Sequence, residues 1–163
     1  MGMQLPGELV VLLNGLGYTY PAADETKLFE LGGKWIDFTS NLGQIKSDAD
    51  AGARIVWDNN SGEDITAFQT QWSAADNPAD ALNASTTGTT VVGIAAILCG
   101  AIVLALKIAT IVQLVILAIQ IAIAIAQAFV TFGASLLQIP IFKIITGKLI
   151  DLGIDRAVAV VLG

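Results

Sequence analysis

The side chains that most often carry chemistry in proteins are scarce in this sequence. There is no histidine and one cysteine, Cys99, which excludes the commonest general base and an internal disulfide. Cys99 lies in an apolar run, where we expect a buried, unreactive thiol. The carboxylate pairs Asp48/Asp50 and Glu63/Asp64 are expected on a solvated helix face and in a first helical turn. We therefore predict a non-enzymatic protein with no catalytic, cofactor or metal site.

Charge is distributed unevenly along the chain. The net charge is −6, with 12 acidic and 4 basic side chains in residues 1–80 and 2 acidic and 4 basic ones in residues 81–163. No cluster of basic residues is present, so nucleic acid is not an expected partner. Hydrophobic residues make up 55% of the chain, and this apolar surface must be covered by protein or by lipid.

The elements that position these residues are predicted to be helices. Residues 5–17 predict a short opening helix, with Pro6 in its first turn and Gly17 as its stop. Residues 24–57 predict an amphipathic helix, so the Gly32–Gly33 pair inside it is not interpreted as a phosphate loop. The apolar seam of this helix follows spacings of three and four: Leu28, Leu31, Trp35, Phe38, Leu42, Ile45, Ala49, Gly52 and Val56.

A turn after Trp57 is expected to fold this helix back on a second one. Asp58–Asn60 has turn chemistry, and Ser61–Asp64 fits a capping box that would begin the next helix. Asp76–Pro78 would interrupt that helix. Residues 24–75 therefore predict an antiparallel helical hairpin. The second helix presents four residues on one face: Ile65, Phe68, Trp72 and Ala75.

The sequence becomes strongly apolar after the hairpin. Residues 79–90 predict a small, polar and partly helical linker, and from Val91 to Phe142 the only charge is Lys107. Long apolar helices are predicted over about 91–135 and 141–162, and the uncharged part of the first is long enough to span a bilayer. The last helix is expected to turn four residues inward: Phe142, Ile145, Leu149 and Leu152.

Three glutamines, Gln113, Gln120 and Gln127, recur every seven residues on the apolar stretch. Their amides need hydrogen-bond partners that lipid does not supply, so this glutamine stripe should face another helix, another copy of the chain, or water. Lys107 is expected to snorkel or to lie against a partner. Together these four residues are a candidate oligomer or pore seam, whereas the simpler interpretation is a mildly polar stripe beside a bundle core.

The predicted hairpin resembles the WXG100 superfamily, which comprises substrates of the type VII (ESX) secretion system. The resemblance rests on Val56–Trp57 at the turn, Gly62–Glu63 at the start of the second helix, and Phe68 with Trp72 along it. Asn59 stands where the Trp-x-Gly motif has its glycine. We expect Trp57, Gly62, Phe68 and Trp72 to determine the hairpin.

Nearly the whole chain further resembles the WXG100-like N-terminal domain of actinobacterial polymorphic toxins, the family of the channel-forming necrotising toxin of mycobacteria. The segments that carry this resemblance are residues 5–9, 17–18, 130–136 and 139–143. It implies pairing with small WXG100-type proteins, contact with the secretion machinery, and help for a C-terminal toxin to cross a membrane. The Tyr-x-x-x-Asp/Glu secretion motif is matched by Tyr20 to Asp24, but ahead of the hairpin, so we interpret this match as chance.

Three functions stay open on the sequence. The first is a targeting and translocation domain, with a hairpin part (1–80) and an apolar part (81–163), that is secreted without a cleavable signal peptide or held at the cell envelope. The second is a membrane-embedded helical pore, and the third is a soluble bundle that self-associates through its apolar helices. The apolar end at 160–163 leads us to expect a longer natural chain or an end buried in an assembly.

Overall fold

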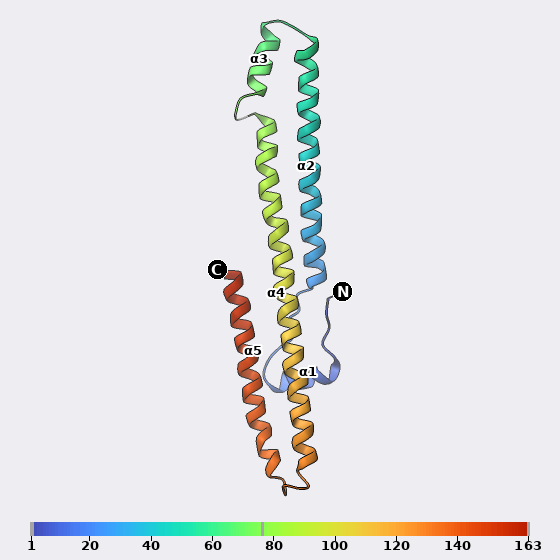
Figure 1. Ribbon diagram of the computed structural model, residues 1–163, viewed down its shortest axis with the longest axis vertical. Helices are drawn as coiled ribbons and strands as arrows, with labels where there is room; N and C mark the ends of the chain where they lie inside the picture. The colour runs from blue at the N-terminus through green and yellow to red at the C-terminus, as the bar shows by residue number, and fades with distance from the viewer. Residues whose placement is uncertain (1, 76, 163) are drawn as a thin grey trace. The chain divides into compact units, whose positions relative to one another are not determined.

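The computed structural model describes residues 2–75 and 77–162, and these residues are helical through most of their length (Figure 1). No strand occurs in this part of the chain, and the all-α prediction is confirmed. The elements in chain order are α1 (Gly7–Gly15), α2 (Glu25–Asn59), α3 (Glu63–Trp72), α4 (Pro78–Gln127), the 3-10 helix η1 (Ala134–Gln138) and α5 (Ile139–Leu162).

The chain forms two compact units that do not follow the expected boundary at residue 80. Unit 1 comprises Met1–Lys27 with Cys99–Gly163, and unit 2 comprises Leu28–Leu98. The long helices α2 and α4 contribute residues to both units. Each unit is described by itself below.

Unit 2 is a helical hairpin in which α2 runs antiparallel to α3 and to the first part of α4 (Figure 1). The predicted turn after Trp57 is present, but the return arm is longer than expected, because α4 continues it. Asn77 caps α4, since its side-chain oxygen accepts a hydrogen bond from the Asp80 amide at 2.9 Å, and Pro78 follows at the first helical position. Asp76, part of the predicted interruption, lies outside the described residues.

Two predictions about the ends of these helices are wrong. Gly62 occupies the cap position of α3 with a φ of 144° and no side-chain hydrogen bond caps the helix, so Ser61 does not form a capping box. Residues 79–90 belong to α4 and are not a linker. Hydroxyl groups such as those of Ser85 and Thr90 donate to carbonyls four residues earlier, which satisfies these polar side chains within the helix.

The buried face of α2 is only partly the predicted one. Every second seam position from Leu28 to Ala49 is buried or half-buried, but Val56 at the end of the seam is exposed. The intervening buried positions lie one residue later, so Leu31, Phe38 and Ile45 are half exposed. The cause is the close approach of α2 and α4 at Gly32, where an added Cβ would lie 2.7 Å from the carbonyl oxygen of Gly93. The inward positions that replace the predicted ones are small or polar: Gly32, Thr39, Lys46 and Ala53.

Unit 1 packs α1 and α5 against the second part of α4, with α5 antiparallel to it (Figure 1). Its core joins one or two residues of each helix: Leu9, Leu13, Leu114 and Ile150. The predicted stop of the opening helix is confirmed, because Gly17 has a φ of 86°. The amides of Gly17 and Tyr18 bond the carbonyls of Asn14 and Leu13, which is the Schellman pattern.

The apolar helix expected over 91–135 ends earlier, at Gln127. The backbone then turns through Phe132 and Gly133, which have positive φ values of 49° and 84° and cannot continue an α-helix. The Ser135 hydroxyl donates to the Ala124 carbonyl at 2.7 Å, which fastens η1 back onto α4. The turn thereby directs α5 back along α4.

Most of the inward face predicted for α5 is wrong, because only Phe142 of the four predicted residues is half-buried. Ile145, Leu149 and Leu152 are exposed, whereas Thr146 and Ile150 are buried. The orientation follows from contacts that hydrophobicity does not record. For example, the Tyr18 hydroxyl lies 2.6 Å from the Asp151 carboxylate and 3.1 Å from the Gly147 carbonyl.

Candidate functional site

Three features are candidates for function: an aromatic cluster at the hairpin turn, a buried ion pair, and a large exposed apolar surface. In residues 2–75 and 77–162 no group of three or more His, Cys, Asp or Glu side chains could hold a metal ion. Cys99 is exposed, so the expectation that it is buried is wrong. Of the carboxylate pairs, Asp48, Glu63 and Asp64 are exposed and Asp50 is half-buried.

The aromatic turn of unit 2 consists of Trp57, Phe68 and Trp72. The ring of Phe68 lies between the two indoles, with its centroid 5.9 Å from that of Trp57 and 5.8 Å from that of Trp72. Tilted aromatic pairs at this spacing contribute beyond the area that they bury. The structure therefore brings three of the four predicted hairpin residues into contact. The fourth, Gly62, occupies the cap position of α3.

Asp50 links the aromatic turn to the middle of α2. The indole N–H of Trp72 donates to one carboxylate oxygen at 3.1 Å, and the ammonium of Lys46 donates to the other at 2.7 Å. These bonds, that of Lys46 before that of Trp72, hold the pKa of Asp50 below its ordinary value. The return arm is thus fixed to α2 by a polar contact as well as by ring packing.

The buried ion pair of unit 1 joins Lys107 of α4 to Glu25 at the start of α2. The two charged atoms lie 2.8 Å apart, with side chains only 3% and 6% exposed. Lys107 also donates to the carbonyls of Ala23 at 2.7 Å and Met3 at 3.2 Å, so all three of its donors are satisfied. Hydrogen bonds from Lys107 and from the Met3 amide lower the pKa of Glu25 to about 2.

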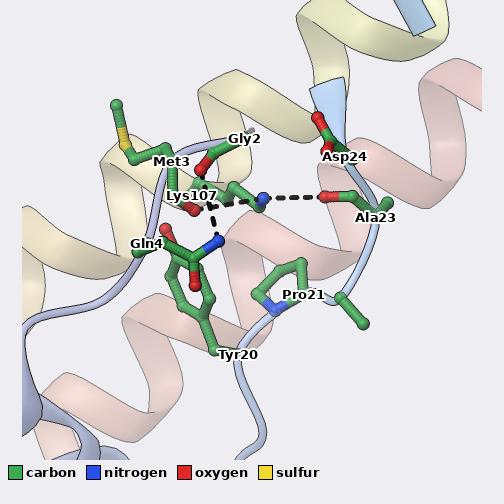
Figure 2. A pocket seen from close by; sticks show the side chains of 9 residues that line it. Gly2, Met3, Gln4, Tyr20, Pro21, Ala23, Asp24 and Lys107 are labelled. Carbon is green, nitrogen blue, oxygen red and sulfur yellow. Dashed lines mark hydrogen bonds between the residues drawn. The ribbon is translucent and has the colours of Figure 1, made fainter. Parts of the chain in front are cut away.

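A polar hollow of about 280 Å³ opens beside Lys107. Figure 2 shows the ammonium between the carbonyls of Met3 and Ala23, with the Tyr20 ring on the adjoining wall. That ring lies 5.5 Å from the ammonium, and its buried hydroxyl has no hydrogen-bond partner among the described residues. Burial, followed by the negative charge of Glu25, raises the pKa of Tyr20. The hollow is thus lined by the same residues, Met3 and Ala23, that bind the ammonium of Lys107.

The glutamine stripe lies beside the buried face of α4. Gln113 and Gln120 are half-buried and Gln127 is exposed, and within the described chain none of their side chains makes a hydrogen bond. Lys107 is on a different face, which it shares with the buried Leu114 and Leu117. Lys107 is therefore bound inside unit 1 and is not part of the stripe, and a seam formed by the glutamines stays a prediction.

Glu25 was missed by the sequence reasoning, although a signal for it existed. Lys107 is the only charge between residues 91 and 142, and a buried ammonium requires an acidic partner. Several acidic residues in the first half of the chain could supply one, so the sequence indicates a partner without identifying it. In the folded chain the segment that follows α1 lies against α4, and this places Glu25 beside Lys107.

The apolar surface belongs to the second part of α4, to the turn that follows, and to α5. An 18-residue window of α4 has a mean hydropathy of 2.6, and only 22% of it is buried. By length and composition, α4 is the one helix in the described part of the chain that could cross a membrane. Exposed residues on α4 include Ile108, Val112, Ile116, Ile119 and Ile123.

A family model described as a WXG100 like domain matches residues 4–148. The match therefore covers α1, the hairpin with its aromatic turn, the whole of α4 and the start of α5. No curated protein and no solved structure matches the chain.

Proposed function

This chain belongs to the WXG100-like domain family, and from that premise we propose that it is a non-enzymatic targeting and translocation domain of a polymorphic toxin exported by the type VII system. Membership of the family relates the chain to type VII secretion. The domain would lead a C-terminal toxin into the export machinery without a cleavable signal peptide. It would then associate with a membrane or stay at the cell envelope.

The observation that carries this proposal is the helical hairpin of unit 2 inside the matched region. Its outer face leaves Leu31, Phe38 and Ile45 exposed on every second turn of α2. A shallow apolar hollow of about 280 Å³ lies there, lined by Leu31, Trp35, Phe38 and the stem of Lys34. An amphipathic helix of a small WXG100-type partner could bury this surface with an apolar face of its own.

An export and co-purification assay tests the proposal. The full chain is expressed in a host with an active type VII system, and its amount in the medium is compared with that of Leu31→Asp/Phe38→Asp. We expect the double variant to lose both export and co-purification of a small helical protein, because charge is placed where apolar contact is needed. Val11→Asp, at an exposed apolar position of α1, is the matched control. Unimpaired export of the double variant contradicts the proposal.

A membrane-embedded pore is the second candidate, favoured by the exposure of α4. Light scattering with and without detergent, followed by conductance measurements in planar bilayers, distinguishes a pore from a protein that does not enter the membrane. A detergent-requiring species with steady conductance, abolished by Gln120→Leu, favours the pore. A defined oligomer that is stable without detergent and shows no conductance favours a self-assembling bundle instead.

A further inference from the structure

We propose that the turn between α4 and α5, residues 128–138, is a membrane-docking tip that inserts shallowly into a bilayer containing anionic lipid. The proposal deepens the membrane association in the proposed function and rests on it. It assigns the contact to one segment and a defined depth, and it does not require α4 to span the bilayer.

The tip presents large apolar side chains to solvent. Phe132 is 98% exposed, Phe129 92%, Val130 81% and Leu137 75%. These are the most exposed large apolar residues of unit 1 outside the last turn of α5. Side chains that contact so little of the fold contribute little to its packing, yet their exposure to water costs free energy.

The backbone at Phe132 adds a second, independent observation. Its φ of 49° is a left-handed conformation that a bulky residue rarely adopts, and for which Gly or Asn is better suited. A fold selected for stability alone would place one of those residues here. Strain held at an exposed aromatic side chain is typical of a functional position.

Charge along the chain sets the expected depth. No charged residue occurs from Ile108 to Phe142, and the first charges after the tip are the exposed Lys143 and Lys148. At 1.5 Å per residue they lie about 6 and 14 Å from the start of α5, whereas interfacial segments sit about 5–10 Å deep. Lipid phosphates would therefore meet these ammonium groups just above the buried tip. The next charge, Asp151, lies further from the tip and is bonded to Tyr18.

The packing of unit 1 favours shallow insertion over a spanning helix. Leu114 and Leu117 of α4 are fully buried, and Leu114 packs in the core with Leu13 and Ile150. A spanning α4 would have to leave these contacts, whereas the tip reaches a bilayer with the core intact. The exposed tip, and not the whole of α4, is therefore the segment ready to bind lipid.

Environment-sensitive labels on the full chain test the proposal, because Cys99 is the only cysteine. In a Cys99→Ser background, an NBD label is placed by Phe132→Cys, by Ile119→Cys on exposed α4, or by Val11→Cys on α1. Vesicles of phosphatidylcholine are compared with vesicles of equal parts phosphatidylcholine and phosphatidylglycerol. We expect a blue shift and quenching by shallow doxyl lipids at position 132 alone, and only with phosphatidylglycerol present.

Three outcomes overturn the proposal. The first is no vesicle-dependent shift at position 132. The second is an equal shift at position 119, which indicates a spanning α4. The third is a shift at position 132 that depends on protein concentration without vesicles, which indicates a second copy of the chain. None of these readings involves the secretion machinery, so export can succeed when tip insertion fails.

Substitution of the tip gives a test in which stability and binding change in opposite directions. Phe132→Asn should raise the melting temperature, because it relieves the left-handed strain, yet weaken binding to the anionic vesicles by roughly ten-fold or more. Phe129→Ser, at a position without that strain, should weaken binding to a similar extent and leave the melting temperature unchanged. Unaltered binding in both variants contradicts the proposal. Lys143→Gln/Lys148→Gln should remove the preference for phosphatidylglycerol.

Discussion

The two units each contain an ion pair of nearly the same length in very different surroundings. Lys107 and Glu25 of unit 1 lie 2.8 Å apart and are 3% and 6% exposed. Lys46 and Asp50 of unit 2 lie 2.7 Å apart but are 29% and 32% exposed. Because the second pair is far more exposed to water than the first, and is screened by it, distance alone does not indicate how much a pair matters to the fold.

The units also close in different ways. In unit 2, α2 and α4 approach closely at Gly32 and Gly93, and the turn is held by aromatic rings. In unit 1, the segments before and after α1 are held to α4 by the ammonium of Lys107 and by a small leucine-rich core. The hairpin of unit 2 therefore depends on glycines at the helix crossing, whereas unit 1 depends on the buried ion pair between Lys107 and Glu25.

The largest expected effect comes from breaking the buried pair. Lys107→Met leaves a carboxylate and two carbonyls without their donor, so the free energy of unfolding should fall by about 3–5 kcal/mol. The same substitution at the exposed pair, Lys46→Met, should cost less than about 1 kcal/mol. Urea unfolding followed by circular dichroism measures both. Equal losses would show that burial does not separate the two pairs.

Acid should weaken unit 1 through Glu25. Its pKa is lowered from 4.5 to about 2 in the folded chain, so the ionised carboxylate stabilises the fold fully above its unfolded pKa. That contribution is lost as the pH falls from about 4.5 towards 2. Thermal unfolding across this range measures the loss, and Glu25→Gln should flatten that part of the curve. A Glu25-dependent loss that is complete above pH 4.5 would contradict the assignment.

The close helix crossing of unit 2 can be tested with neighbouring glycines. Gly32→Ala places a Cβ 2.5 Å from Ile97 Cγ1 and 2.7 Å from the Gly93 carbonyl oxygen, and should destabilise the hairpin by about 1–3 kcal/mol. Gly33→Ala meets nothing within 4 Å and should stabilise the helix by about 0.5–1 kcal/mol. Urea unfolding compares them, and a shared sign would argue against the crossing.

The smallest effect is expected at the aromatic turn. Trp72→Phe keeps a ring against Phe68 but loses the hydrogen bond to Asp50, so unit 2 should lose about 0.5–1.5 kcal/mol. Trp35→Phe is the control, because the indole N–H of Trp35 bonds no other described residue. Hydrogen exchange of the α3 amides locates the change. Faster exchange in both variants alike would show that the Asp50 contact contributes nothing specific.

Local chemistry along the chain determined much of this fold. The helices, the glycine stop after α1, the turn after Trp57 and the apolar length of α4 all follow from side-chain type and spacing over a few residues. The contacts of Trp57, Phe68 and Trp72 are also local, because a short turn separates the arms that carry them. Such interactions can be recognised in the sequence because the residues that make them are close neighbours along the chain.

Tertiary structure alone decided which helix faces became buried. Hydrophobic periodicity selected Leu31 and Ile145, but the folded chain turned Gly32 and Thr146 inward. At Gly32 the cause is the close approach of α2 and α4, and on α5 it is the set of contacts that Tyr18 makes. It also decided that Lys107 pairs with Glu25, since the sequence offered many acids and only folding brings one of them to α4. Contacts between residues far apart in the sequence depend on how the helices pack against one another. The residue types of a single helix do not determine that packing.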